Sequence, residues 1–171
     1  MTTAVAPLAR QVEARAQRDS GFAAVLDAIL EAPTVPQGTL EHIAAQALND
    51  QRRAAVVRDF VESALPTPKV QELLGLGTPQ AVHRLRSRGK LLGTAVGNRT
   101  WFPAWQFDDD RLRPDLPQIL ELLARFTSDP LAADRIMRIT HDELGGASIA
   151  QALRHAQTAA TAWRMLAALG A

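Results

Sequence analysis

The spacing of apolar residues predicts helices in the first third of the chain. Ser20 precedes the apolar run FAAVLDAILEA and can cap a helix there, and a segment containing two prolines and a glycine then ends it. From Thr39 to Leu65, apolar residues recur at intervals of three and four, which is the pattern of a long amphipathic helix. Because an apolar stripe at this spacing usually packs against another protein surface, we expect residues 1–65 to form a helical assembly or dimerisation segment.

The pattern changes between Pro66 and Pro103, where two short helices are predicted. Each begins with a threonine followed by a proline, a cap residue and a residue suited to the first helical position. The helices KVQELL and QAVHRLRSR flank the tight turn 75–77, and Gly89 can end the second in a left-handed conformation. Two short helices around such a turn have the spacing of a helix-turn-helix.

A β-hairpin is predicted directly after the second helix. Residues 92–96 and 99–102 form two short extended runs, separated by the dipeptide Gly97-Asn98, which suits a two-residue turn. A hairpin in this position would be the wing of a winged helix-turn-helix, for which we take the boundaries 66–107.

Helical spacing returns in the last third of the chain. The acidic run 108–110 and Pro114 indicate that the segment from Trp105 to Pro114 is a linker. Beyond it, helices are expected near residues 117–126, 130–139, 148–155 and 158–169, with a sharp turn at Gly145-Gly146. We therefore predict a mainly α fold: a helical N-terminal segment, a winged helix-turn-helix with a small β-hairpin, and a C-terminal helical domain at 115–171.

Composition narrows the functional classes. The chain has 171 residues, 47% of them apolar, which suits one compact domain or two small ones. It has no cysteine and no apolar run of the roughly 18 residues that a membrane helix needs, so we expect a cytoplasmic protein without disulfides and without contact to a membrane. No phosphate-binding, zinc-protease or hydrolase motif is present, and the group 140–143 suits a polar loop better than a metal or acid-base site. We expect no enzyme activity, no cofactor and no metal.

The distribution of charge points to a polyanionic partner. The net charge is only +1, but residues 66–107 contain six basic side chains and one acidic one. No acidic residue lies between Glu72 and Asp108. A basic segment between near-neutral flanks favours binding to nucleic acid over a generally adhesive surface.

The second helix of this segment has two distinct faces. Val82 and Leu85 form a narrow apolar stripe, and the opposite face carries hydrogen-bonding side chains without any carboxylate. Arginine can pair with guanine and glutamine with adenine in the major groove, so we expect Arg84 and Gln80 to read bases. An exposed basic helix face alone usually reflects solvation. DNA binding is favoured here because the face occurs together with the helix caps, the segment without acidic residues and the hairpin. The predicted DNA-binding residues are Thr78, Gln80, His83, Arg84, Arg86, Ser87, Arg88, Lys90, Asn98 and Arg99, with Arg88, Lys90 and Arg99 on phosphates.

Residues 65–103, LPTPKVQELLGLGTPQAVHRLRSRGKLLGTAVGNRTWFP, resemble the winged helix-turn-helix of the excisionase and MerR-like class. In that class a short helix, a tight turn, a recognition helix and a wing end in a strand with an aromatic-Phe-Pro sequence. The resemblance implies that residues 78–88 enter the major groove of double-stranded DNA and that the wing contacts the flanking backbone. The chain departs from the pattern of a phage excisionase, which begins at about this motif.

Residues 129–170 are similar to the toxin-binding domain of Xre/MbcA/ParS-type antitoxins. The similarity lies in a helix, a polar loop with Leu-x-Gly, and a serine that starts the next helix. The chain departs from it at Ile136 and Met137, where an aromatic is frequent, at Ile149 in place of proline, and at Ala156 near a usual glycine. The resemblance implies binding of a NAD-degrading RES-type toxin; the alternative is a generic helical oligomerisation domain. The candidate partner-binding residues are Leu144, Gly145, Gly146, Ser148, Leu153 and Trp163, of which Trp163 also fits a plain core position.

These patterns predict a sequence-specific DNA-binding repressor. The resemblance of residues 129–170 implies that 115–171 is a partner-binding domain and that the protein doubles as an antitoxin. One helix-turn-helix offers a small footprint, so a homodimer or larger assembly is expected, held mainly by residues 21–65. The alternative is an architectural or segregation protein that oligomerises along DNA without a toxin partner.

Overall fold

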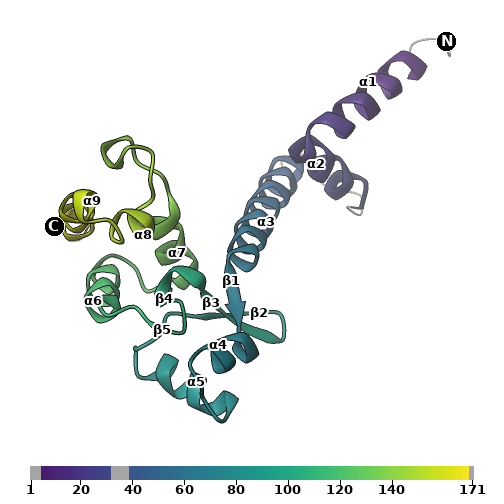
Figure 1. Ribbon diagram of the computed structural model, residues 1–171. Helices are drawn as coiled ribbons and strands as arrows, with labels where there is room; N and C mark the ends of the chain where they lie inside the picture. Colours follow the sequence, from purple (N-terminus) through teal and green to yellow (C-terminus); the bar gives the residue numbers. More distant parts are fainter. Residues whose placement is uncertain (1–4, 32–38, 170–171) are drawn as a thin grey trace. The chain divides into compact units, whose positions relative to one another are not determined.

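The computed structural model describes residues 5–31 and 39–169 (Figure 1). The chain divides into two compact units, residues 1–56 and 57–171. The fold is mainly helical with a small antiparallel sheet, as the sequence predicted. Among the described residues, no helix is both long enough and apolar enough to cross a membrane.

The first unit consists of helices. It contains α1 (Val5–Arg18), α2 (Ser20–Glu31) and most of α3 (Thr39–Glu62). Asp19, and not the predicted Ser20, accepts a hydrogen bond from the backbone N–H of Phe22, at 3.0 Å, at the start of α2. The Ser20 hydroxyl instead accepts from the Gln51 side chain at 2.9 Å. The proline-containing segment 33–38, expected to end α2, lies outside the described residues.

A three-stranded antiparallel sheet forms the start of the second unit. It has the order β1-β3-β2, with β1 at Ala64–Pro66, β2 at Thr94–Val96 and β3 at Arg99–Pro103. The helical spacing predicts a helix to about Leu65, but α3 ends at Glu62 and Leu65 lies in β1. The reason is long-range pairing, because Ala64 lies opposite Pro103 and Pro66 opposite Trp101.

Two short helices lie between β1 and β2, where the sequence predicted them. They are α4 (Thr67–Leu73) and α5 (Pro79–Ser87). Neither threonine caps its helix through its side chain, and the Thr67 hydroxyl donates to the carbonyl of Thr100, at 3.4 Å, instead. Gly89 has the expected left-handed conformation, with φ of 66°, and ends the turn that follows α5.

The predicted linker from Trp105 to Pro114 is part of the core, so that prediction is wrong. This segment forms a 3₁₀ turn (Ala104–Gln106) and a small hairpin of β4 (Phe107–Asp108) and β5 (Arg111–Leu112). Trp105, Gln106 and Phe107 are buried, and Asp109 and Asp110 are exposed at the turn of the hairpin. The acidic run therefore marks a surface turn between buried strands.

Helices complete the second unit. They are α6 (Leu116–Phe126), α7 (Pro130–Arg138), a 3₁₀ turn (Asp142–Leu144), α8 (Ile149–Ala152) and α9 (Ala156–Ala168). One cluster of buried apolar side chains runs from Val70 in α4 to Leu166 in α9. Segments 66–107 and 115–171, expected as two domains, therefore share a single hydrophobic core.

Candidate nucleic-acid interface

Helix α5 presents its polar face to solvent. Val82 is fully buried against the core that contains Val70, and Leu85 is half-buried. The predicted contact residues on and around the helix are all exposed: Thr78, Gln80, His83, Arg84, Arg86, Ser87, Arg88 and Lys90. The helix is thus anchored through one narrow stripe. The opposite face is open to solvent and can contact a large ligand such as a nucleic acid.

The turn between β2 and β3 lies beside the start of α5. A groove of about 470 Å³ is lined by His83 of α5 together with Asn98 and Arg99 of the turn. Pro66, Thr67, Pro68, Pro79 and Thr100 line the rest of this groove. Three residues that are separated by up to 16 positions in the sequence are thus brought together in one groove.

The basic side chains around α5 are not neutralised by carboxylates. Within the part of the chain that the structure describes, no ion pair involves Arg84, Arg86, Arg88, Lys90 or Arg99. The hydrogen bonds in this region go to backbone carbonyls: Arg86 donates to Gly93 at 3.5 Å, and the Ser87 hydroxyl donates to Arg84 at 3.1 Å. Their charges are therefore available to a polyanion.

A buried glutamine, which sequence reasoning missed, holds the loop between α5 and β2. The Gln106 amide accepts from the backbone N–H of Leu92 at 2.7 Å and donates to the Leu92 carbonyl at 2.8 Å. It also donates to the carbonyl of Pro103 at 3.2 Å. These bonds fix the loop that positions Lys90 relative to the sheet. A polar residue inside the aromatic run WQF was the only signal for this role.

The close approach of Gly93 to the sheet supports the same loop. A Cβ atom at this position would lie 2.6 Å from Cδ1 of the buried Phe102. Only glycine therefore lets the chain pass across this ring before β2 begins.

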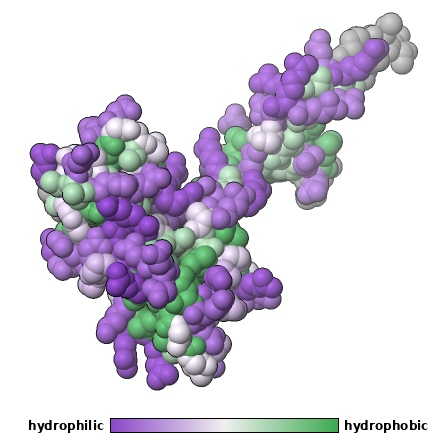
Figure 2. Space-filling view, viewed as in Figure 1, coloured by the Kyte–Doolittle hydropathy of each residue, from purple (hydrophilic) through white to green (hydrophobic). Residues whose placement is uncertain are grey.

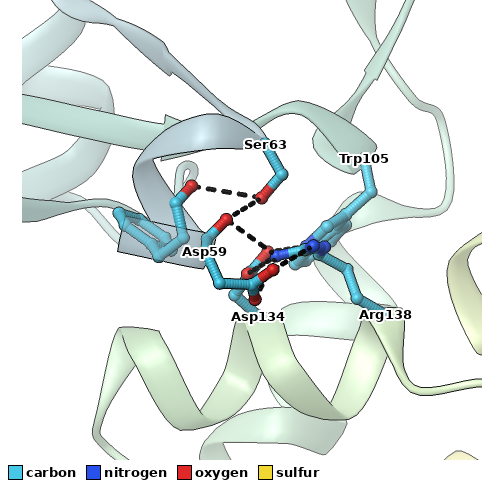
Figure 3. A network of polar contacts seen from close by, with 6 residues as sticks. Asp59, Ser63, Trp105, Asp134 and Arg138 are labelled. Carbon is cyan, nitrogen blue, oxygen red and sulfur yellow. Dashed lines mark hydrogen bonds and ion pairs between the residues drawn. The ribbon is translucent and has the colours of Figure 1, made fainter. Parts of the chain in front are cut away.

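A second polar network joins α3, α7 and the segment after β3 (Figure 3). Arg138 donates to both carboxylate oxygens of Asp59, at 2.9 and 3.0 Å, and to Asp134 at 3.3 Å. The Trp105 indole N–H donates to Asp134 at 2.9 Å. Burial raises the pKa of Asp134 above its ordinary value, although the bonds from Trp105 and Arg138 oppose this shift. Hydrogen bonds to Asp59 and Asp134 raise the pKa of Arg138 above its ordinary value.

The candidate partner-binding residues occupy different environments. Leu144 and Ser148 are buried, Leu153 and Trp163 are half-buried, and Gly145 and Gly146 are exposed in a left-handed turn. Ser148 begins α8 with a reciprocal capping box with Gln151. Leu144 and Ser148 therefore shape the turn from inside, and the glycines are the part of it that a partner can reach.

Comparison with known proteins does not place the chain in a family. No family model matches it, and no curated protein or solved structure is significantly similar to it.

Proposed function

We propose that the protein is a sequence-specific DNA-binding repressor in which residues 66–107 act as a winged helix-turn-helix. Helix α5 would enter the major groove, and the β2–β3 turn would contact the flanking backbone. The observation that carries this proposal is the exposed polar face of α5, whose basic side chains form no ion pair with any described residue, beside Asn98 and Arg99.

The positions of the side chains suggest two kinds of contact. Gln80 and Arg84 belong to α5, where they can reach base edges, so they would determine sequence preference. Arg88 and Lys90 follow the helix, and Arg99 begins β3, so these three would hold phosphates without reading sequence. Neutralising phosphates releases counterions, and binding should therefore weaken steeply with salt.

The first unit supports assembly with a second copy of the chain. None of its described side chains, at residues 9–31 and 41–56, is buried, although α2 carries the sequence FAAVLDAIL. Hydrophobic surface is visible around α2 in Figure 2. Leu30 is 73% exposed. Helices without a buried core are marginal in water, so pairing of two copies would stabilise this unit and supply two DNA-binding modules for two half-sites.

The additional role as an antitoxin depends on the sequence resemblance of residues 129–170. The exposed turn at Gly145-Gly146 and the half-buried Trp163 would form part of the surface offered to a RES-type toxin. Coexpression of the full chain with the product of an adjacent gene tests this role: rescue of growth and copurification are expected. A harmless neighbouring product would leave the repressor without an antitoxin role.

The architectural alternative is favoured by the same helix α2, in which no side chain is buried and Ile29 and Leu30 are exposed. If the first unit joins more than two copies, the protein would spread along DNA from its binding site. Footprints that extend with protein concentration would favour this alternative, and a footprint of constant length would favour the repressor.

Capture of genomic fragments by the tagged full-length protein, followed by sequencing, tests the proposal. A shared short motif among the bound fragments is expected, and Arg84→Ala should lose it. Arg135→Ala is the matched control, because Arg135 is an exposed helical arginine outside the basic segment. Bound fragments without a common motif, or no bound fragments, would overturn the proposal.

A further inference from the structure

A second cavity lies at the end of α5 and has a mainly apolar wall. It measures about 520 Å³ and is lined by Leu112, Pro114, Leu116, Pro117, Leu120 and Ala124, along β5 and most of the length of α6. This volume falls within the roughly 300–1,000 Å³ that is usual for small-molecule sites. We call it the α6 cavity.

Within residues 5–31 and 39–169, one of the charged side chains at the α6 cavity has no ion-pair partner. Arg113 is bound to Asp115 through two bonds of 2.6 and 2.8 Å, and Glu121 is bound to Arg125 at 2.6 Å. Lys90 also lines the cavity, and it forms no ion pair among the described residues. The cavity therefore combines an apolar wall with one available ammonium group.

A smaller space continues the α6 cavity. It measures about 200 Å³ and shares Gly89, Leu120 and Ala124 with the larger one. It extends past Leu91 and Leu92 toward α7. A ligand longer than the main cavity could therefore continue along α6.

We propose that the α6 cavity binds a small amphipathic carboxylate that regulates DNA binding. The apolar body would lie against Leu116, Leu120 and Ala124, and the carboxylate would pair with Lys90. This inference rests on the proposed function, because Lys90 is also one of the expected phosphate contacts. A carboxylate on Lys90 removes that contact, so the bound ligand should weaken DNA binding.

Calorimetric titration of the DNA-free full-length protein tests the site by itself. The probe is 1-naphthylacetate, and its uncharged counterpart is 1-naphthylacetamide. The carboxylate should bind more tightly than the amide. Lys90→Gln should reduce affinity for the carboxylate about two- to fivefold, the size of an exposed ion pair, and leave affinity for the amide unchanged. Lys69→Gln is the matched control, because Lys69 is an exposed lysine that pairs with Glu72 outside the cavity.

A cavity-filling variant locates the probe. Ala124 is exposed on α6 and lines both spaces, so Ala124→Trp should abolish binding of both compounds while thermal unfolding stays cooperative. Equal affinity for the two compounds, or binding that survives Ala124→Trp, would overturn the proposed site.

DNA affinity measured with and without 1-naphthylacetate then tests regulation. The compound should weaken DNA binding by the wild type and leave Ala124→Trp unaffected. Tight ligand binding with unchanged DNA affinity would overturn the regulatory role. A protein that binds the carboxylate but no DNA would overturn the proposed function, whereas a DNA-binding protein that ignores the carboxylate would overturn the cavity proposal alone.

Discussion

Replacing Gln106 by methionine tests whether a buried amide holds the loop between α5 and β2. The side chain is fully buried and makes three hydrogen bonds, two to Leu92 and one to Pro103. Methionine has a similar length and can fill the space, but it cannot replace these bonds. At about 1 kcal/mol for each bond, Gln106→Met should lower the free energy of unfolding by about 2–4 kcal/mol. Gln106→Ala should cost about 1–2 kcal/mol more, because it also leaves a cavity.

Urea denaturation followed by tryptophan fluorescence measures this loss, since all three tryptophans lie in the second unit. Gln118→Met is the matched control, because Gln118 is exposed on α6 and its replacement should change stability by less than about 0.5 kcal/mol. If Gln106→Met changes the unfolding free energy no more than this control does, the bonds to Leu92 do not stabilise the loop and the reasoning is refuted.

Three further predictions follow from single residues. Gly93→Ala should destabilise the protein by about 1–3 kcal/mol in thermal unfolding, because its Cβ would overlap the Phe102 ring, whereas Gly77→Ala meets open space and should be nearly neutral. Burial raises the pKa of Asp134 above 3.8, so the folded state holds this proton more tightly than the unfolded state does. The stability of the wild type relative to Asp134→Asn should therefore fall as the pH rises through that raised pKa. If the unfolding free energies of the two proteins, measured by urea denaturation, change in parallel with pH, this prediction is contradicted. Leu30→Arg should shift the full chain toward monomer in sedimentation velocity, and an unchanged mass would exclude α2 from the interface.

The parts of the fold that the sequence predicted depend on local chemistry. Gly89 ends the turn after α5 because a left-handed residue is needed there, and Ser148 begins α8 because its hydroxyl caps the backbone. Such signals involve residues within a few positions of each other, so they can be recognised without knowledge of the tertiary structure. The exposed and buried faces of α5 follow from helical spacing for the same reason.

The parts that the sequence did not predict depend on distant partners. Strand β1 exists because Ala64 pairs with Pro103, which overrides the helical spacing that continues to Leu65. The acidic run suits solvent and indicates a linker from Trp105 to Pro114, but the aromatic residues Trp105 and Phe107 before that run are buried. Buried Arg113 is satisfied by Asp115 and by backbone carbonyls as far away as Ala150. No local pattern indicates a contact of this kind.

The same distinction applies to the candidate site. The predicted DNA-binding residues lie on or beside α5 and in the β2–β3 turn, so their exposure could be predicted from helical and hairpin spacing. The groove that joins His83 to Arg99, and the α6 cavity beside Lys90, depend on tertiary packing. Neither could be predicted from the sequence.

The most direct test of DNA recognition is fluorescence anisotropy on the captured motif and on a scrambled duplex, across a range of salt concentrations. Arg84→Ala should cost about 1–3 kcal/mol on the captured motif and little on the scrambled duplex. Arg99→Ala should weaken both equally and reduce the slope of log affinity against log salt by about one unit. If Arg84→Ala reduces affinity for the captured motif and for the scrambled duplex by the same factor, α5 does not read sequence and the central claim is contradicted.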